Sequence, residues 1–110
     1  MAKTRRTRNH LITRSRMQKF VESHPGTERD LDTLLAWCNS VTGTVWRNWS
    51  DVRKSFPHAD PYPGDLICFN VGGNKYRILA GIEYIPDRPA VVYVKAVLTH
   101  KEYDALNKQK

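Results

Sequence analysis

The second half of this chain alternates between runs of strand-forming residues and short turns, and no other feature restricts its fold as strongly. The runs 66–71, 75–85 and 90–98 are rich in aromatic and β-branched side chains. Between the first two lies Gly72-Gly73-Asn74, which tolerates the positive φ angles of a hairpin turn. The segment 86–89 has a proline at each end and makes the next turn. Three runs joined by tight turns predict an antiparallel sheet.

Side chains along a strand point alternately to the two faces of a sheet. In the run 75–85, Tyr76 and Ile78 therefore fall on one face, whereas Lys75 and Arg77 fall on the other. We expect the first face to cover the core and the second to carry cations.

The first part of the chain predicts a short strand followed by a helix. The strand is expected at 9–13, and Thr13 or Ser15 can cap the helix behind it. The apolar side chains of this helix share one face, and Pro25-Gly26 ends it.

Two further helices are predicted before the sheet. Thr27 and Asp30 have the spacing of a capping box for the second helix, which ends at Gly43. Its apolar positions follow the helical period: Leu31, Leu34, Leu35 and Cys38. The third helix is short, is expected to be capped by Ser50, and stops before Pro57.

These elements predict one α+β domain. A chain of 110 residues is long enough to bury a core without disulfides or a metal. We expect residues 1–8 to be a basic arm and 9–110 to form a single domain, in which a small, mainly antiparallel β-sheet packs against the N-terminal helices. A proline-rich loop at 60–64 precedes the sheet, and a short C-terminal helix begins with a capping box of Thr99 and Glu102.

The positive charge of the chain is concentrated at its N-terminus. The sequence has 18 Lys and Arg against 11 Asp and Glu, a net charge of +7, and this excess precedes Glu22. Such clusters bind polyanions by releasing counterions, although they can equally be solvated tails. Cys38 and Cys68 lie within apolar patterns, as reduced core thiols do. Since no apolar run reaches membrane-spanning length, we expect a cytoplasmic protein without membrane contacts.

Side chains with the chemistry for RNA cleavage lie in the hairpin and at the start of the last helix. Cleavage without a metal needs the ribose 2′-OH to attack its own phosphate, with a base, an acid and cations nearby. Arg77 is suited to stabilise the negative charge that develops on the phosphate, because its planar guanidinium can bind two phosphate oxygens, and Lys75 adds a second cation. His100 is matched to proton transfer at neutral pH. Tyr103 projects from about the same helix face and can exchange a proton if neighbouring cations lower its pKa.

Each of these residues also has an ordinary structural role. Taken alone, Arg77 is typical of a surface arginine, His100 of a helix cap and Tyr103 of half-buried packing. Asp104 is expected to orient His100 or to pair with a cation rather than to act as the base.

Other side chains are weaker candidates. His10, His24 and His58 lie in different segments without metal-ligand spacing, and we interpret them as incidental. Trp46 and Trp49 are expected to pack in the protein rather than to stack on bases. We expect neither a metal nor a cofactor.

Two C-terminal motifs, Phe69-Asn-Val-Gly-Gly-Asn-Lys-Tyr-Arg77 and Thr99-His-Lys-Glu-Tyr-Asp104, occur together with Leu11-Ile12-Thr13, Leu35-Ala36-Trp37 and Phe56-Pro57. With them, the chain from His10 onward resembles the HigB family of RelE-like toxins. The resemblance implies a RelE-like fold and a ribosome-dependent mRNA interferase of a type II toxin–antitoxin system. It also implies a HigA-type helix-turn-helix antitoxin, targets in mRNA and ribosomal RNA, and DNA contacts only through the antitoxin.

The matching motifs imply a site near the hairpin and the last helix. The expected catalytic residues are Arg77, His100, Tyr103 and Lys75, and the expected RNA contacts are Asn74 and Lys101 from the same motifs, with Lys95 and Arg14 outside them. The basic segment before His10 departs from the family, whose members usually begin close to the first strand.

Two other functions compete with this one. A non-catalytic RNA- or ribosome-binding module would use the arm and the Lys75/Arg77 face without chemistry, so its RNA binding would depend on salt but not on His100. A DNA-binding repressor is disfavoured, because no helix-turn-helix pattern is visible and the surplus cations lie on a tail.

Overall fold

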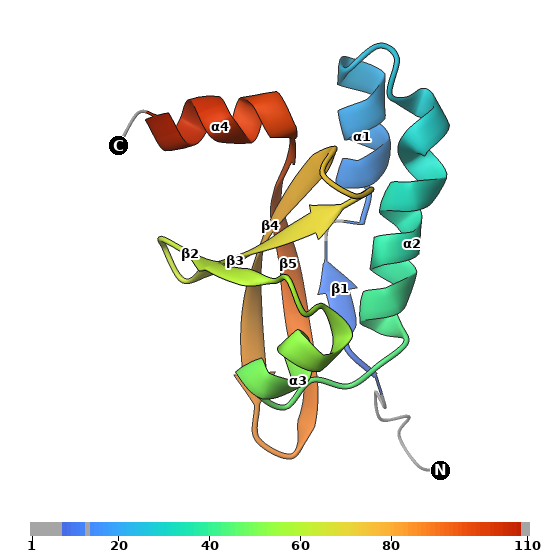
Figure 1. Ribbon diagram of the computed structural model, residues 1–110. Helices are drawn as coiled ribbons and strands as arrows, with labels where there is room; N and C mark the ends of the chain where they lie inside the picture. Colours follow the sequence, from blue (N-terminus) through green and yellow to red (C-terminus); the bar gives the residue numbers. More distant parts are fainter. Residues whose placement is uncertain (1–7, 13, 109–110) are drawn as a thin grey trace.

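The described part of the chain forms a five-stranded sheet flanked by helices (Figure 1). The computed structural model describes residues 8–12 and 14–108. The strands are β1 (His10–Ile12), β2 (Asp60–Tyr62), β3 (Leu66–Val71), β4 (Tyr76–Ile85) and β5 (Arg88–Thr99). The helices are α1 (Arg16–Ser23), the short 3-10 helix η1 (Glu28–Asp30), α2 (Leu31–Thr42), α3 (Trp49–Ser55) and α4 (His100–Lys108). Within these ranges, no helix is long and apolar enough to cross a membrane.

The strands are ordered β1-β5-β4-β3-β2, with β1 parallel to β5 and the other neighbours antiparallel. The three strand-forming runs of the sequence became β3, β4 and β5, although β5 is longer than predicted. Helices α1 and α2 lie side by side along the sheet, and α4 leaves the end of β5 toward the opposite side (Figure 1). The predicted α+β class, with a mainly antiparallel sheet and a short C-terminal helix, is confirmed and is consistent with a RelE-like fold.

The core lies between the sheet and the helices α1 and α2. Tyr76, Ile78 and Ala80 of β4 belong to the core cluster, as predicted for their face. On the other face, Arg77 and Leu79 lie outside that cluster but are buried too, so this half of β4 has no exposed cation face. An aromatic cluster lies nearby, in which Trp46 stacks on Phe69 with 6.2 Å between ring centroids and Phe56 meets both rings edge-on. Trp46 is therefore a packing residue, as predicted, and Trp49 packs against the same core.

Two predicted helix caps differ from the structure. Ser15 precedes α1 but makes no capping bond with its side chain, and the alternative cap, Thr13, lies outside the described residues. Thr27 donates to the carbonyl of His24 at 2.6 Å instead of forming the predicted capping box. Side chains cap a helix from an extended backbone, whereas Ser15 and Thr27 both have helical dihedral angles.

Helix α3 is capped by Asn48 rather than by the predicted Ser50. Asn48 has an extended backbone, with φ −164° and ψ 176°, and its side-chain oxygen accepts from the N–H of Asp51 at 3.0 Å. Asn and Ser are almost equally favoured as caps, so residue preference alone does not choose between the two positions.

Residues 60–62, predicted as part of a loop, form the edge strand β2 instead. Asp60 pairs with Cys68 and Tyr62 with Leu66. Pro61 has no N–H to donate, which an edge strand tolerates because one of its sides needs no partner. Pro61 is therefore compatible with a strand at the edge of the sheet, although its presence suggested a loop.

Asn9 is a buried polar side chain that no sequence motif singles out. Its amide nitrogen donates to the carbonyl of Val41 at 3.1 Å. Its amide oxygen accepts from the backbone N–H groups of Trp46, at 2.9 Å, and Ala90, at 3.2 Å. One side chain thus joins the end of α2, the segment after it and β5.

We expect Asn9→Ala to lower the free energy of unfolding by about 2–4 kcal/mol, because it leaves buried backbone groups without partners. Urea denaturation followed by tryptophan fluorescence measures this loss. Asn39→Ala is the matched control, since Asn39 is exposed and its loss is expected to cost less than about 0.5 kcal/mol. Equal stability of the two variants would contradict the role given to Asn9.

Candidate active site

Arg77 lies at the second position of β4 and is buried. Its Nη1 donates to the backbone oxygens of Asn74 and Tyr76, both at 3.2 Å. Its Nη2 donates to Oδ1 of Asn74 at 3.1 Å and lies 3.0 Å from Nδ1 of His100. Its Cζ lies 5.3 Å from the ring centroid of Tyr103, within cation–π range. Three of the expected catalytic residues, Arg77, His100 and Tyr103, are therefore in contact, and Asn74 joins them.

The guanidinium fork of Arg77 is already occupied. A guanidinium has five N–H donors, and the four on Nη1 and Nη2 face the acceptors just named. The sequence led us to expect an Arg77 guanidinium that is free to bind two phosphate oxygens, whereas in the structure both of its terminal nitrogens already have protein partners. Among the described residues, Arg77 forms no ion pair with a carboxylate. A buried cation without an anion is costly, so an anion bound beside Arg77 would be favourable.

The partners of His100 fix its tautomer. An arginine side chain can only donate, so Nδ1 of His100, which faces Arg77, carries a lone pair. Nε2 lies 3.2 Å from Oδ2 of Asp104 and carries the proton. Asp104 therefore orients His100, which was one of its two expected roles. Because the side chains of His100 and Asp104 are 49% and 51% exposed, solvent weakens this contact.

A capping box holds the start of α4 and, with it, His100. Oγ1 of Thr99 accepts from the N–H of Glu102 at 3.1 Å, and Oε1 of Glu102 accepts from the N–H of Thr99 at 2.9 Å. The box predicted from the sequence is confirmed. The N–H of His100 also donates to the carbonyl of Lys75 at 2.9 Å, which ties the helix start to the turn between β3 and β4.

The environment of Tyr103 shifts its pKa upward. Burial raises the pKa of Tyr103, and this effect outweighs the hydrogen bond with Asn107, which lowers it. The neighbouring Cys68 thiol raises the pKa further. The downward shift considered from the sequence is therefore wrong, and the hydroxyl stays protonated at neutral pH. In this state it is suited to donate a hydrogen bond rather than to accept a proton.

Lys75 does not share a face with Arg77, although strand alternation predicted that it would. It lies in the turn before β4, and its Nζ is 3.4 Å from Oδ2 of Asp30. The same oxygen accepts from the hydroxyl of Tyr76 at 2.6 Å, and this bond lowers the pKa of Asp30. Burial and the bond together raise the pKa of Tyr76 to about 12. The prediction was wrong because alternation begins only where the strand begins, at Tyr76.

Lys95 lies on the same face of the sheet as Arg77. It occupies an irregularity in the pairing of β5 with β4, where an extra residue lacks a direct partner. A Cβ placed on Gly81 would lie 3.8 Å from Cε of Lys95, so the missing side chain leaves room for the lysine stem. The Nζ of Lys95 lies 5.5 Å from the ring centroid of Tyr93.

The other expected RNA contacts are not all near the cluster. Lys101 is exposed on the first turn of α4, directly after His100. Arg14 donates to Oδ1 of Asn39 in α2 at 2.6 Å, so the structure places it with the helical hairpin rather than with His100. Of the basic arm, residues 1–7 lie outside the described residues.

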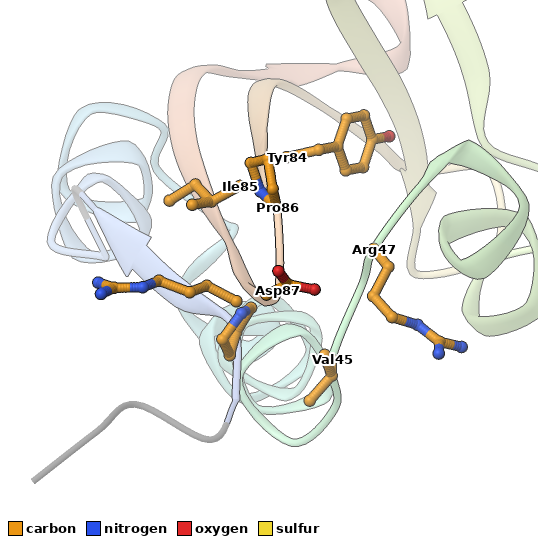
Figure 2. A pocket seen from close by; sticks show the side chains of 8 residues that line it. Val45, Arg47, Tyr84, Ile85, Pro86 and Asp87 are labelled. Carbon is orange, nitrogen blue, oxygen red and sulfur yellow. The ribbon is translucent and has the colours of Figure 1, made fainter.

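Two hollows of the described surface are lined by residues other than Arg77, His100 and Tyr103. The hollow in Figure 2, of about 660 Å³, lies between Val45 and the end of β4 with the turn that follows it, and Tyr84 and Asp87 are among its lining residues. It is at the opposite end of β4 from Arg77. A hollow of about 470 Å³, lined in part by His58, adjoins the cluster through Asn74. Cleavage of an extended RNA chain needs reactive groups on an accessible face, so we place the site at the cluster.

Neither cysteine is suited to be a nucleophile. Cys38 and Cys68 are free and buried, as predicted, and burial raises the pKa of both thiols. Within residues 8–12 and 14–108, no three His, Cys, Asp or Glu side chains are grouped to hold a metal ion.

Two residues near the site escaped the sequence-based prediction. Asp30 was expected only to cap a helix, but it binds Lys75 and Tyr76. His24, interpreted as incidental, contacts Glu102 of α4 at 2.9 Å. No local pattern signals either contact, because each partner lies far away in the sequence.

Comparison with known proteins assigns the chain to one class. A family model described as "HigB_toxin, RelE-like toxic component of a toxin-antitoxin system" matches residues 31–106. The mRNA interferase toxin HigB of Escherichia coli (strain K12) is 30% identical over 97 residues, which cover 86% of this chain and 88% of the relative. The mRNA interferase HigB of Shigella flexneri gives the same values. The mRNA interferase HigB of Escherichia coli O6:H1 is 26% identical over 101 residues, 90% of this chain and 92% of the relative.

The class is thus the RelE-like toxic component of a toxin–antitoxin system. The family match covers more than half of the chain, including Arg77, His100 and Tyr103. The chain belongs to the HigB toxin family, and the resemblance seen in its motifs is confirmed.

Proposed function

We propose that this toxin is a metal-independent endoribonuclease that cuts translated mRNA on the ribosome and thereby inhibits translation and growth. Membership of the HigB family makes the chain a toxin of a toxin–antitoxin system. The name of its relatives, mRNA interferase, supports RNA cleavage. The observation that carries the proposal is the contact of the buried Arg77 guanidinium with His100 and Tyr103.

The cluster supplies the groups that attack by a ribose hydroxyl needs. The 2′-oxygen bonds to the adjacent phosphorus while the bond from phosphorus to the 5′-oxygen breaks, which leaves a 2′,3′-cyclic phosphate and a 5′-hydroxyl. Neutral His100 has one lone pair, on Nδ1, and takes the 2′-OH proton there once the hydroxyl has replaced Nη2 of Arg77. The released Nη2 then binds a phosphate oxygen and stabilises the developing charge. Tyr103 donates its proton toward the leaving 5′-oxygen.

The remaining cations and partners follow from the same proposal. Lys101, on the first turn of α4, and Lys95, on the same face of the sheet as Arg77, bind phosphates of the RNA outside the bond that is cut. Family membership implies an antitoxin. We infer that it is a HigA-type helix-turn-helix protein and that DNA is bound only through it. The toxin acts in the cytoplasm, where mRNA is translated on ribosomes.

Cleavage is expected to depend on translation. In a reconstituted translation system, the purified toxin is given an mRNA with a start codon and, in parallel, the same mRNA without one. We expect cuts inside the reading frame, about 10²-fold faster in the translated message, because the ribosome holds the RNA in a reactive geometry.

The outcomes separate the proposal from its alternative. Equal cleavage of both messages would contradict ribosome dependence. A folded toxin that binds RNA in a salt-dependent manner but cuts neither message would favour the non-catalytic RNA- or ribosome-binding module.

A further inference from the structure

His24 joins the end of α1 to the start of α4. Its Nε2 lies 2.9 Å from Oε2 of Glu102, a residue 78 positions away. Its Nδ1 lies 2.8 Å from the carbonyl oxygen of Phe20, and its ring stacks on Phe20 with 4.0 Å between centroids. The hydroxyl of Ser23 donates to the same carbonyl at 3.0 Å and lies 2.9 Å from Nδ1. Both ring nitrogens of His24 therefore have partners, Nδ1 in α1 and Nε2 in α4.

Both ring nitrogens of His24 face acceptors. The carbonyl of Phe20 can only accept, and the hydroxyl hydrogen of Ser23 points to that carbonyl, so Nδ1 carries a proton. An ionised carboxylate also only accepts, so Nε2, which faces Glu102, carries a second proton. Below its raised pKa, His24 is therefore an imidazolium with a charge-assisted hydrogen bond to α4.

Glu102 is also the residue that closes the capping box of α4. Its Oε1 accepts from the N–H of Thr99, while its Oε2 faces His24. The first turn of the same helix carries His100 and leads to Tyr103. One carboxylate is thus shared between His24 and the capping box of this turn.

We propose that His24, as a charged imidazolium, is a positioning residue for the catalytic cluster, which acts through Glu102 to hold His100 and Tyr103 against Arg77. This inference rests on the proposed function, because it assigns His24 a role in that reaction. Displacement of catalytic groups by about 1 Å can cost as much as 10²-fold in rate, so an indirect contact of this kind matters for cleavage.

The groups around His24 act on its charge in opposite directions. The hydrogen bond with Glu102 raises the pKa of His24 above its ordinary value of 6.5, and this outweighs burial, which lowers it. Because the folded-state pKa is raised, the stabilisation is complete below the ordinary value and is lost as pH rises through the folded-state pKa. Glu102 of α4 contacts the ring directly, and Tyr76 of β4 packs edge-on against Phe20, the stacking partner of His24. Arg16 and Lys19 of α1 and Val97 of β5 line a hollow together with His24.

An NMR titration of the full chain tests the link without needing cleavage. In the wild type, we expect the ring protons of His24 and the backbone amides of His100 and Tyr103 to shift with one midpoint above 6.5. Glu102→Gln keeps the capping box, since Gln also serves at this position, but it removes the carboxylate. The midpoint of His24 is then expected to fall, and the amides to stop following it. The inference would be overturned if Glu102→Gln left the midpoint of His24 unchanged. It would also be overturned if the wild-type amides of His100 and Tyr103 did not shift at that midpoint.

Cleavage of translated mRNA across the same pH range tests the catalytic role. We expect the wild-type rate at saturating RNA to fall as pH rises through the midpoint of His24. His24→Gln is expected to cut about tenfold more slowly below that midpoint, and its rate should not fall as pH rises through it. His10→Gln is the control, because His10 is exposed at the end of β1, and it should keep the wild-type pH profile. A wild-type profile in His24→Gln overturns this inference alone. A wild type that cuts no RNA at any pH contradicts the proposed function, and the role of His24 with it.

Discussion

Replacing Arg77 with Ala is expected to slow RNA cleavage about 10²- to 10³-fold and to restore growth to cells that express the toxin. The change removes a buried cation that, among the described residues, no carboxylate balances. It also removes the donor that faces Nδ1 of His100 and the cation over the ring of Tyr103. Single-turnover cleavage of a translated mRNA measures the loss, together with growth after induction.

The fold is expected to survive this substitution, because removing a buried charge that has no ionic partner relieves a desolvation cost, and this offsets the lost hydrogen bonds to Asn74 and Tyr76. Arg77→Lys keeps the charge but not the planar set of donors, so we expect it to recover only part of the rate. Arg88→Ala is the matched control, since Arg88 is exposed at the far end of β5 and should leave cleavage unchanged. A folded Arg77→Ala protein that cuts mRNA at the wild-type rate would remove Arg77 from the site.

The second large effect is expected at His100, where substitution by Asn should slow cleavage about 10²- to 10⁴-fold. The amide oxygen of Asn can take the place of Nδ1 and still accept from Nη2 of Arg77. It cannot take up a proton near neutral pH. The variant therefore removes proton transfer while it keeps the contact that orients Arg77, and the same single-turnover assay measures the change.

Asp104→Asn is the companion variant for His100. It weakens the acceptor that holds the proton on Nε2, but the contact is half-exposed, so we expect a loss of less than about tenfold. If His100→Asn cut mRNA as fast as the wild type, His100 would serve only to hold Arg77, and the base would have to be another group.

The features that could be predicted from the sequence are those with a local cause. Side-chain alternation and turn residues located β3 and β4, because both act between neighbours in the chain. The capping box of Thr99 and Glu102 formed because its two members are three residues apart and each satisfies the other. Thr27 and Asp30 have the same spacing, but the backbone of Thr27 is not extended, and spacing alone does not reveal that.

The features that could not be predicted depend on distant partners. The direction of Lys75 is set by Asp30, 45 residues away, and the contact of His24 with α4 depends on Glu102, 78 residues away. The pKa of Tyr103 follows from its burial, which only the packing of α4 decides. The motif resemblance named the residues of the cluster, but it did not reveal that the fork of Arg77 is filled by the protein itself.

The central claim is that mRNA is cut by attack of its own ribose hydroxyl at the cluster of Arg77, His100 and Tyr103, and the chemistry of the new RNA ends tests it most directly. The wild-type toxin and His100→Asn are induced in bacteria, and RNA 5′ ends are mapped by ligation with and without prior phosphorylation. We predict new ends inside translated messages that ligate only after phosphorylation, as 5′-hydroxyl ends do, and that are rare in the variant. New ends that carry a 5′-phosphate, or that are equally abundant with His100→Asn, would contradict the account.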